Sequence, residues 1–233
     1  MIRTEQVAAG RVNGHVAHAE KPRAGILLLP TITGIDVFTR ALAERLAEAG
    51  FTTMIWNPYP GEVAPADIPS AQARASKLND GAVDTMSECV SYMLEKLKLP
   101  AIGTVGFCLG GRYAVLLAGR DRRMFGCVPY YPSIRVPNSP NQALDAMAIA
   151  ADIQCPVHLV HGTGDQVFVQ SAFVQLRDVL ERRPAATFVQ VHPAAVHSFM
   201  RPDLQSVPAN ASATGLSWPP VLAFLEACLA RRN

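Results

Sequence analysis

The sequence predicts an α/β fold: a doubly wound, mostly parallel sheet with helices on both faces. Short, continuous apolar runs recur along the chain and suit strands that are buried on both sides. Segments with helical periodicity lie between these runs, and such alternation is typical of parallel sheets. The 233 residues, 49% hydrophobic and 17% charged, are enough to bury a sizeable core. We therefore expect a single domain over residues 1–233.

The N-terminal half begins the alternation. Residues 5–19 are expected to form a hairpin with Asn13-Gly14 as its turn. Asp36–Ala49 should form a helix that Asp36 caps and that ends at Gly50; its apolar positions are 37, 41, 42, 46 and 49. The proline-rich loop 57–70 is a candidate rim or lid of an active site. Strands are predicted at Gly25–Pro30 and Phe51–Trp56.

The remaining elements continue the same pattern. Residues 80–98 should form a helix whose methionine-rich stripe belongs to the core. The stretch 132–152 is expected to be irregular and then a short helix, close to the active site. Further helices are predicted at 168–182 and 216–230, and further strands at 101–105, 124–131, 155–160 and 187–191.

The stretch Gly106–Gly111 (GFCLGG) carries the most specific signal. It follows the apolar run Ala101–Val105 and precedes Arg112–Ala118, which has helical character. A strand, a glycine-flanked residue and a helix form a nucleophile elbow, where a strained turn exposes one side chain at the positive end of the helix. That residue is Cys108, and such a place stabilises a thiolate. Taken alone, the motif fits a buried cysteine in a glycine-rich turn equally well.

Two later segments supply partners for Cys108. Residues 155–165 (CPVHLVHGTGD) predict a strand and a tight glycine turn with Asp165 at its tip. The strand at 187–191 is followed by a loop that holds His197. A thiol needs a base to become a thiolate, and an imidazole needs a partner to orient it. The order nucleophile, acid, histidine is that of the α/β-hydrolase fold, so we expect Cys108, Asp165 and His197 to fill those roles.

On these motifs the chain resembles the dienelactone hydrolase family of α/β-hydrolases. The matching pieces are GFCLGG (106–111), HGTGDQVFV (161–169) and HSFMR (197–201), and the resemblance runs from about Gly25 to the end. It implies a carboxymethylenebutenolidase-like hydrolase of a carboxylic ester or lactone, which forms a thioester acyl-enzyme on the cysteine. It also implies an oxyanion hole made by the backbone N–H groups of Ile32 and Leu109.

The chain departs from the family pattern near the nucleophile. Thr31 stands where the family carries a glutamate that contacts the resting cysteine. This leaves open whether a dienelactone is accepted. Arg201, in HSFMR, matches a family arginine that binds the substrate carboxylate, and Arg74 lies near the place of a second one, shifted in register. Tyr131, at a strand end, fits either pocket lining or packing. We include these four residues among those expected to bind substrate.

Composition narrows the remaining possibilities. A net charge of +2 with no basic stripe gives no indication of a nucleic-acid partner. The first residues lack the apolar core of a signal peptide, and no apolar stretch approaches the roughly 20 residues that span a bilayer. Five cysteines without close pairing or metal-ligand spacing favour reduced thiols in the cytoplasm. We expect no metal, although His158, His161 and His192 invite one, and no cofactor.

Three functions remain open at this level. The leading one is a Cys-His-Asp hydrolase acting on a small-molecule ester or lactone, as a monomer or weak homo-oligomer. An esterase of broad tolerance, which also accepts organophosphate esters, is favoured by the absence of the glutamate at Thr31. A non-enzymatic thiol sensor would use Cys108 as a redox switch. The presence of both Asp165 and His197 favours an enzyme, because a sensor needs only a reactive, accessible thiol.

Overall fold

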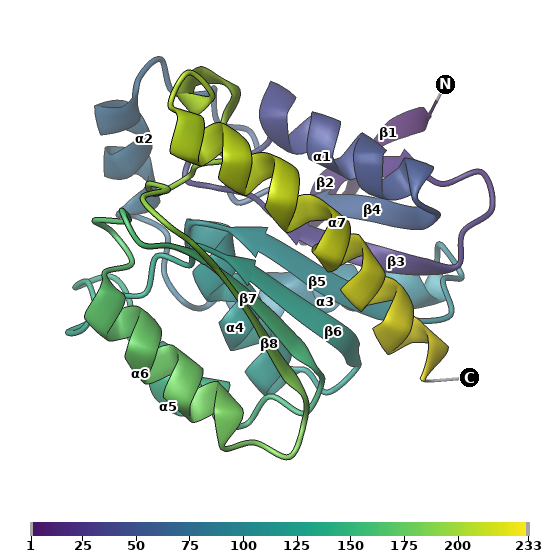
Figure 1. The fold of residues 1–233 in the computed structure, drawn as a ribbon. Coiled ribbons are helices and arrows are strands. Elements are labelled where there is room, and N and C mark those ends of the chain that lie inside the picture. The colour runs from purple at the N-terminus through teal and green to yellow at the C-terminus, as the bar shows by residue number, and fades with distance from the viewer. Residues whose placement is uncertain (1, 232–233) are drawn as a thin grey trace.

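The computed structural model describes residues 2–231, and these form one sheet with helices on both faces (Figure 1). The strands are β1 (Arg3–Ala9), β2 (Val12–His18), β3 (Ala24–Leu29), β4 (Phe51–Trp56), β5 (Ile102–Phe107), β6 (Met124–Tyr130), β7 (Val157–Gly162) and β8 (Thr187–His192). The helices are α1 (Val37–Glu48), α2 (Ile68–Ala75), α3 (Ala82–Glu95), α4 (Leu109–Arg120), α5 (Ala146–Ala150), α6 (Gln170–Glu181) and α7 (Pro208–Ala230), with a 3-10 turn η1 (Pro202–Leu204).

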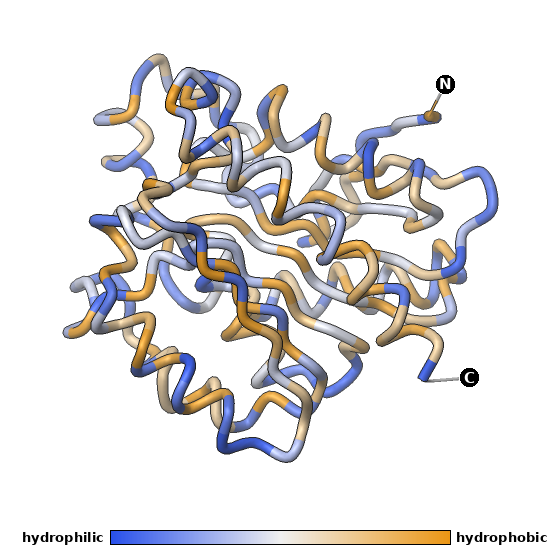
Figure 2. The backbone as a smooth tube through the Cα atoms, in the orientation of Figure 1, coloured by the Kyte–Doolittle hydropathy of each residue, from blue (hydrophilic) through white to orange (hydrophobic). Residues whose placement is uncertain are grey.

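The sheet is mostly parallel, as predicted. Its strand order is β1-β2-β4-β3-β5-β6-β7-β8. The pairs β1–β2 and β2–β4 are antiparallel, and every other pair is parallel. Helices α1 and α7 cover one face, and α3, α4 and α6 cover the other (Figure 1). Because both faces are covered, β3 to β7 are buried along their whole length, and their hydrophobic residues form the centre of the fold (Figure 2).

The N-terminal hairpin is present, but its predicted turn is wrong. Ala9 pairs with Val12, so the turn is Gly10-Arg11, and Gly10 has a positive φ of 61°. Asn13-Gly14 lies inside β2 instead. A Cβ atom on Gly14 would stand 2.3 Å from the carbonyl oxygen of Ile55 in the next strand. That glycine therefore serves a close approach between strands and not a reversal of the chain.

Helix α1 begins where the sequence indicated. Asp36 accepts a hydrogen bond from the Thr39 N–H at 2.8 Å, and Thr39 Oγ1 accepts one from the Asp36 N–H at 2.9 Å, which completes a capping box. The predicted apolar stripe is wrong at two positions, since Val37 is 85% exposed and Ala41 is exposed. Thr39 is fully buried. Its hydroxyl is satisfied by the cap, so a polar residue replaces an apolar one on the inner face.

Helix α2 is present in the structure but was not predicted from the sequence. It begins inside the stretch predicted as the loop 57–70, because Asp67 caps it by accepting from the Ser70 N–H at 2.8 Å. Pro69 stands in the first turn, a position where its missing N–H costs nothing. Of residues 57–70 only Ile68 lines the cavity described below, together with residues of α2 that follow it. The rim at this point is mainly a helix and not a loop.

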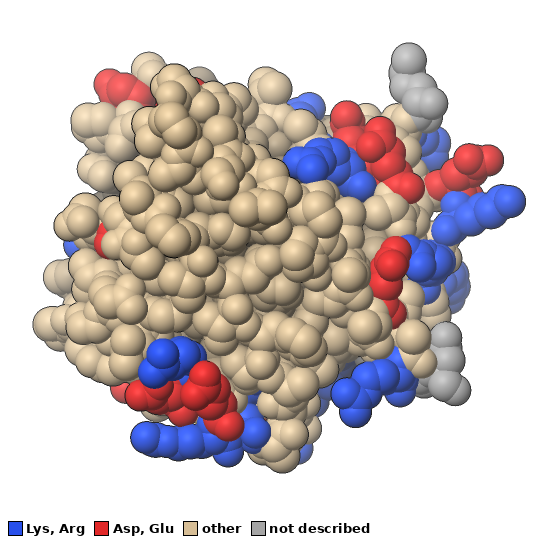
Figure 3. Space-filling model, in the orientation of Figure 1, with Lys and Arg blue, Asp and Glu red and all other residues tan. Residues whose placement is uncertain are grey.

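Helix α7 starts eight residues before its predicted beginning and includes Pro219 and Pro220. By length and composition it could cross a membrane, so the expectation that no apolar stretch approaches that length is wrong. In the fold it packs against β6, β7 and β8, and 44% of its most apolar window is buried. Charged side chains lie around the margin of the face shown in Figure 3, which α7 crosses. The packing is that of a core helix that covers a sheet.

The direction in which successive strands are added to the sheet reverses between the neighbouring strands β3 and β5. The chain leaves β3 toward β4 on one side, and it leaves β5 toward β6 on the other. Loops at the carboxyl ends of two such neighbouring strands diverge, and open α/β sheets bind ligands in the crevice between them. Cys108 follows β5 directly, and the segment 30–36 follows β3. The topology thus brings together the elbow and the loop predicted to complete it.

Candidate active site

The strained elbow is present at Cys108. This residue has φ 56° and ψ −115°, in the region that side-chain-bearing residues rarely adopt. A Cβ on Gly106 would lie 2.1 Å from the Gly110 oxygen, and a Cβ on Gly110 would lie 2.0 Å from the Leu29 oxygen. Gly111 is constrained less severely, since its Cβ would lie 2.8 Å from the Tyr130 oxygen. The glycines of the motif are therefore required by the crossing of β3, β5 and α4.

Asp165 and His197 are in direct contact. Asp165 Oδ2 lies 2.8 Å from His197 Nδ1. Its other oxygen, Oδ1, accepts from the backbone N–H groups of Val167 at 2.7 Å and Phe168 at 2.8 Å. Asp165 is only 3% exposed, so three hydrogen bonds satisfy a buried carboxylate. This arrangement fixes the orientation of the imidazole and favours its protonated form.

The thiol and the imidazole shift each other's pKa. Burial by itself raises the pKa of Cys108, but the positive charge of the nearby His197 imidazolium outweighs it, so the pKa is lowered. Burial likewise lowers the pKa of His197, but the charge of Cys108 and the hydrogen bond to Asp165 reverse this, so that pKa is raised. Both shifts favour a thiolate–imidazolium pair near neutral pH.

A cavity of about 690 Å³ opens over these groups. Cys108 and His197 lie in its lining, as do Ile32 and Leu109, whose N–H groups were expected to form the oxyanion hole. One wall comes from α2 and the residue after it, and another comes from the loop between β6 and α5. Its further lining residues include Thr31, Gln72, Ser76, Ser133, Arg135, Ser139, Asn141, Gln142, Arg201 and Asp203.

Thr31 lines the cavity, but its hydroxyl is hydrogen-bonded to the hydroxyl of Thr33. Thr33 Oγ1 donates to Asp36 Oδ2 at 2.7 Å, so the single hydroxyl proton of Thr33 is already used. The 2.7 Å contact between Thr31 Oγ1 and Thr33 Oγ1 then requires Thr31 to be the donor. The Thr33 N–H donates back to Thr31 Oγ1 at 3.3 Å. The Thr31 proton is thereby directed along the loop and away from the thiol.

Arg74 does not occupy the place expected of a substrate ligand. Its guanidinium donates to the carbonyl oxygens of Val63 at 3.0 Å and Thr33 at 2.9 Å. The guanidinium carbon lies 3.7 Å from the ring centroid of Tyr59. Within the part of the chain that the structure describes, Arg74 is not among the residues that line the cavity. Its contacts support the 31–34 turn from behind.

Tyr131 is a packing residue, which decides between the two interpretations left open. It is fully buried, and its ring packs edge-on against His197 at 5.4 Å and Phe199 at 5.1 Å. It therefore supports the histidine from behind and, among the described residues, lies outside the cavity lining. Arg201 does line the cavity, but a two-point ion pair joins it to Asp203 at 2.9 Å.

The sequence did not single out several residues of the cavity wall. Arg135 and Gln142 belong to the loop after β6, and Asp203 stands two residues beyond Arg201. The available signals were that Arg135 and Gln142 belong to a loop that follows a parallel strand, and that Asp203 is close in sequence to Arg201, which was expected to bind substrate. His161, in contrast, stacks on Phe173 at 4.2 Å in the core. The described residues contain no cluster of three or more side chains able to hold a metal ion.

Comparison with known proteins identifies the family. The model of the dienelactone hydrolase family matches residues 12–229. The chain belongs to that family. It is therefore an enzyme of the hydrolase class with the α/β-hydrolase fold, as its motifs predicted.

Individual family members are distant from this chain. It is 28% identical over 210 residues to carboxymethylenebutenolidase from Rhodococcus opacus, and the match covers 86% of this chain and 80% of that protein. A solved structure assigned to the dienelactone hydrolases, from Klebsiella pneumoniae, has a TM-score of 0.81 at 23% identity and covers 96% and 98% of the two chains. A dienelactone hydrolase-like promiscuous phosphotriesterase from metagenomic libraries has a TM-score of 0.76 at 20% identity, with 97% and 98% covered. At such identities the structural likeness concerns the fold.

Proposed function

We propose that this hydrolase cleaves a small carboxylic ester or lactone with the triad Cys108, His197 and Asp165. The observation that carries the proposal is the 2.8 Å contact between His197 Nδ1 and Asp165 Oδ2, because His197 lines the same cavity as a cysteine on a strained elbow. Membership of the dienelactone hydrolase family and the likeness to carboxymethylenebutenolidase support the choice of substrate class.

The reaction follows from the charges in the site. The Cys108 thiolate attacks the carbonyl carbon, and the electron pair of the carbonyl moves onto its oxygen. When this oxyanion collapses, the bond to the alcohol oxygen breaks and the His197 imidazolium gives its proton to the leaving alkoxide. A thioester remains. Neutral His197 then takes a proton from water, and the hydroxide attacks the thioester. The second oxyanion collapses, which releases the carboxylic acid and restores the thiolate–imidazolium pair. In a lactone the released alcohol stays attached to the acyl group.

Two backbone N–H groups are proposed to stabilise the oxyanion. Leu109 is the first residue of α4, directly after Cys108, and it lines the cavity. The Thr31 carbonyl accepts from the Gly34 N–H at 3.1 Å, so the Ile32 N–H on the opposite side of the same planar peptide points out of the turn. A single donor of this kind is typically worth about 3–4 kcal/mol of transition-state stabilisation.

Arg74 is proposed as a positioning residue for this hole. It donates to Thr33 O at 2.9 Å and reaches Ile32 O at 3.5 Å, which holds the following peptides of the turn on the side away from the cavity. The Gly110 N–H donates to the Pro30 oxygen at 3.0 Å and fixes the other end of the turn against α4. The two donors of the hole are thereby held relative to each other.

The charged side chains of the cavity bear on the substrate. Arg201 is proposed to bind a substrate carboxylate, although its pairing with Asp203 offsets much of its charge. Thr31 leaves the space beside Cys108 without the carboxylate of the family pattern. A neutral ester should therefore be accepted as well as an anionic one, because no fixed charge next to the thiol selects between them.

A broader activity on organophosphate esters is the second candidate. It is supported by the structural likeness to a promiscuous phosphotriesterase and by the uncharged Thr31 beside the nucleophile. A cytoplasmic location and a monomeric or weakly associated state stay predictions from the sequence.

The test is turnover by purified protein of p-nitrophenyl acetate, a panel of lactones and a phosphotriester, with Cys108→Ala as the control. We expect multiple turnovers of the carboxylic esters, loss of activity in the variant, and an acyl adduct on Cys108 detected by mass spectrometry. Stoichiometric oxidation of Cys108 with no turnover of any substrate would contradict the proposal and favour the thiol sensor.

A further inference from the structure

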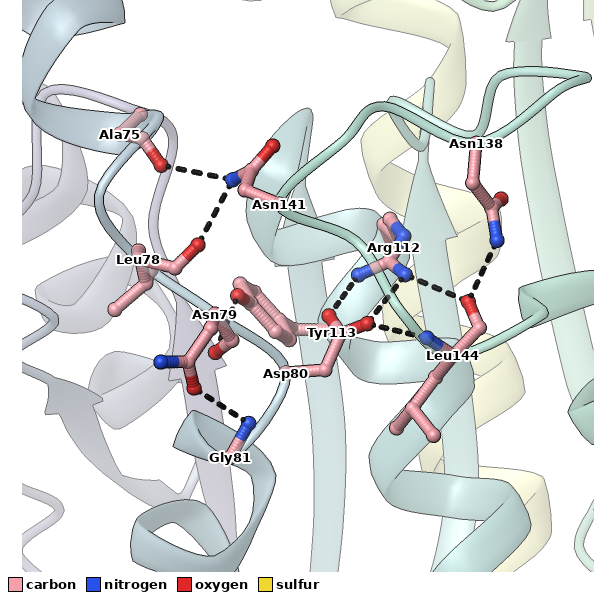
Figure 4. A network of polar contacts seen from close by, with 10 residues as sticks. All are labelled: Ala75, Leu78, Asn79, Asp80, Gly81, Arg112, Tyr113, Asn138, Asn141 and Leu144. Atoms are coloured by element: carbon pink, nitrogen blue, oxygen red, sulfur yellow. Dashed lines mark hydrogen bonds and ion pairs between the residues drawn. The ribbon is translucent and has the colours of Figure 1, made fainter.

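The side chain of Asn141 joins the two side walls of the cavity. One wall includes Ala75 and Ser76 at the end of α2, and the other is the loop segment 139–142. Asn141 belongs to the loop, and its amide nitrogen donates to the carbonyl oxygens of Leu78 at 2.8 Å and Ala75 at 3.3 Å (Figure 4). Both amide protons are used in these contacts. The side chain thus links two segments that lie sixty-three residues apart in the chain.

Behind this contact the walls share a buried ion pair. The Arg112 guanidinium has no solvent exposure and holds both Asp80 oxygens, at 2.5 and 3.0 Å. The same pair binds the end of the loop, because Arg112 donates to Leu144 O at 2.9 Å and Asp80 Oδ2 accepts from the Leu144 N–H at 2.7 Å (Figure 4). Asp80 stands just before α3. The far ends of both walls are therefore fastened to α4.

Helix α4 also carries the nucleophile. The Arg112 N–H donates to the Cys108 oxygen at 3.2 Å, one turn from the elbow. Breaking a buried ion pair by removing one partner is strongly unfavourable, so the bases of both walls keep a constant distance from Cys108. The contacts of Asn141 are different in kind: they are neutral, partly exposed and placed at the cavity itself. Of these two links between the walls, the Asn141 contacts are the weaker, so they are the more easily broken.

We propose that Asn141 is a specificity-determining residue: by tying the 139–142 loop to the end of α2, it sets the size of the group that fits beside Cys108. This inference rests on the proposed hydrolysis at Cys108. With the tie in place, the cavity admits small acyl or alcohol groups. Without it, the loop moves away from α2 and bulkier groups gain access, while the triad, on other elements, keeps its geometry.

Two variants remove the tie in different ways. Asn141→Asp keeps the size and shape of the side chain but replaces the donor by a carboxylate, which the Leu78 and Ala75 carbonyls repel. Asn141→Ala removes the side chain. The matched control is Asn138→Ala, in the same loop: the Asn138 amide donates to Leu144 O at 3.1 Å, within the loop and not across to α2 (Figure 4).

The measurement is kcat/KM for p-nitrophenyl acetate and for p-nitrophenyl esters of bulkier acids. In both Asn141 variants we expect the preference for acetate over the bulky esters to fall by about tenfold or more. A change of this size is typical of pockets that discriminate substrates by size. The change should appear in KM rather than in kcat. In Asn138→Ala the preference should stay within about twofold of wild type. A merely structural role would lower kcat for all esters alike.

A second readout does not depend on ester turnover. Labelling of Cys108 by iodoacetamide should keep its rate in every variant, whereas labelling by a biotin-linked maleimide should accelerate only in the Asn141 variants. Unchanged selectivity in both assays, an equal change in Asn138→Ala, or failure of both Asn141 variants to fold would overturn the inference. Absence of ester turnover in the wild type, with the labelling difference intact, would instead overturn the proposed function.

Discussion

Replacing Asp165 by asparagine tests the link between the carboxylate and the thiol. The Val167 and Phe168 N–H groups hold one oxygen of Asp165 at 2.7 and 2.8 Å. In the Asp165→Asn variant that place must go to the amide oxygen, because two donors cannot face an NH₂ group. The NH₂ group then faces His197 Nδ1, which becomes the acceptor. The imidazole is driven to carry its proton on Nε2, where it cannot receive the proton of Cys108.

The size of the effect follows from the hydrogen bond that is lost. A hydrogen bond to a charged group contributes about 1.5–3 kcal/mol. Because the Asp165 carboxylate is buried, screening by solvent reduces this energy only slightly. At about 1.36 kcal/mol per pKa unit, this loss should lower the pKa of His197 by about 1–2 units. Less imidazolium then faces Cys108, which raises the pKa of the thiol, and this effect opposes the smaller lowering expected from removal of the Asp165 charge. Because the folded-state pKa of Cys108 is lowered, the thiolate exists above that pKa and is lost as the pH falls through it. The variant loses its thiolate at a higher pH.

The assay is the pH dependence of iodoacetamide alkylation at Cys108, together with kcat/KM for p-nitrophenyl acetate. We expect the alkylation midpoint to move to higher pH and kcat/KM at neutral pH to fall by about 10–100-fold. Asp178→Asn is the matched control, because it removes one negative charge at an ion pair with Arg177 on α6, away from the cavity. An unchanged midpoint in Asp165→Asn would refute the argument.

Four further predictions concern single side chains. Cys108→Ala should retain the fold, by circular dichroism, and keep less than about a tenth of wild-type ester turnover; activity above that level would exclude Cys108 as the nucleophile. His197→Ala should reduce kcat/KM nearly as much as loss of Cys108 and slow iodoacetamide labelling, since base and nucleophile act as a unit; unchanged labelling would separate them. Thr31→Glu places an anion beside the thiol, so the alkylation midpoint should shift to higher pH and the range of esters should narrow; identical profiles would contradict the role given to Thr31. Arg74→Met should lower kcat about tenfold with KM little changed if Arg74 positions the oxyanion hole; a rise in KM confined to anionic esters would instead indicate a substrate ligand.

The triad was predictable from the sequence because each member sits in a motif with its own local requirement. Gly106 and Gly110 are demanded by the crossing of backbones around Cys108, where a Cβ would lie about 2 Å from a carbonyl oxygen. Asp165 follows a buried strand through a tight glycine turn. The carboxyl ends of parallel strands share one edge of the sheet, so a correct strand assignment places these residues near one another.

Several errors arose where one residue type serves two purposes. Asn13-Gly14 has the composition of a hairpin turn, but Gly14 is needed for its close approach to Ile55. Asp67 looks like part of a proline-rich loop, but it caps α2. In both cases the local sequence permits either structure, and the pairing with a distant segment decides between them.

The sequence by itself determined the doubly wound sheet, the elbow and the order of nucleophile, acid and base, since these depend on periodicity and on backbone space that only glycine leaves. The tertiary structure decided what the other polar side chains do. Arg74 and Arg201 are both arginines near strand ends, but one meets backbone carbonyls and the other meets Asp203 in the cavity. Asn141 faces Leu78 from a segment sixty-three residues away. Such partners are set by the packing of whole elements, which no local pattern encodes.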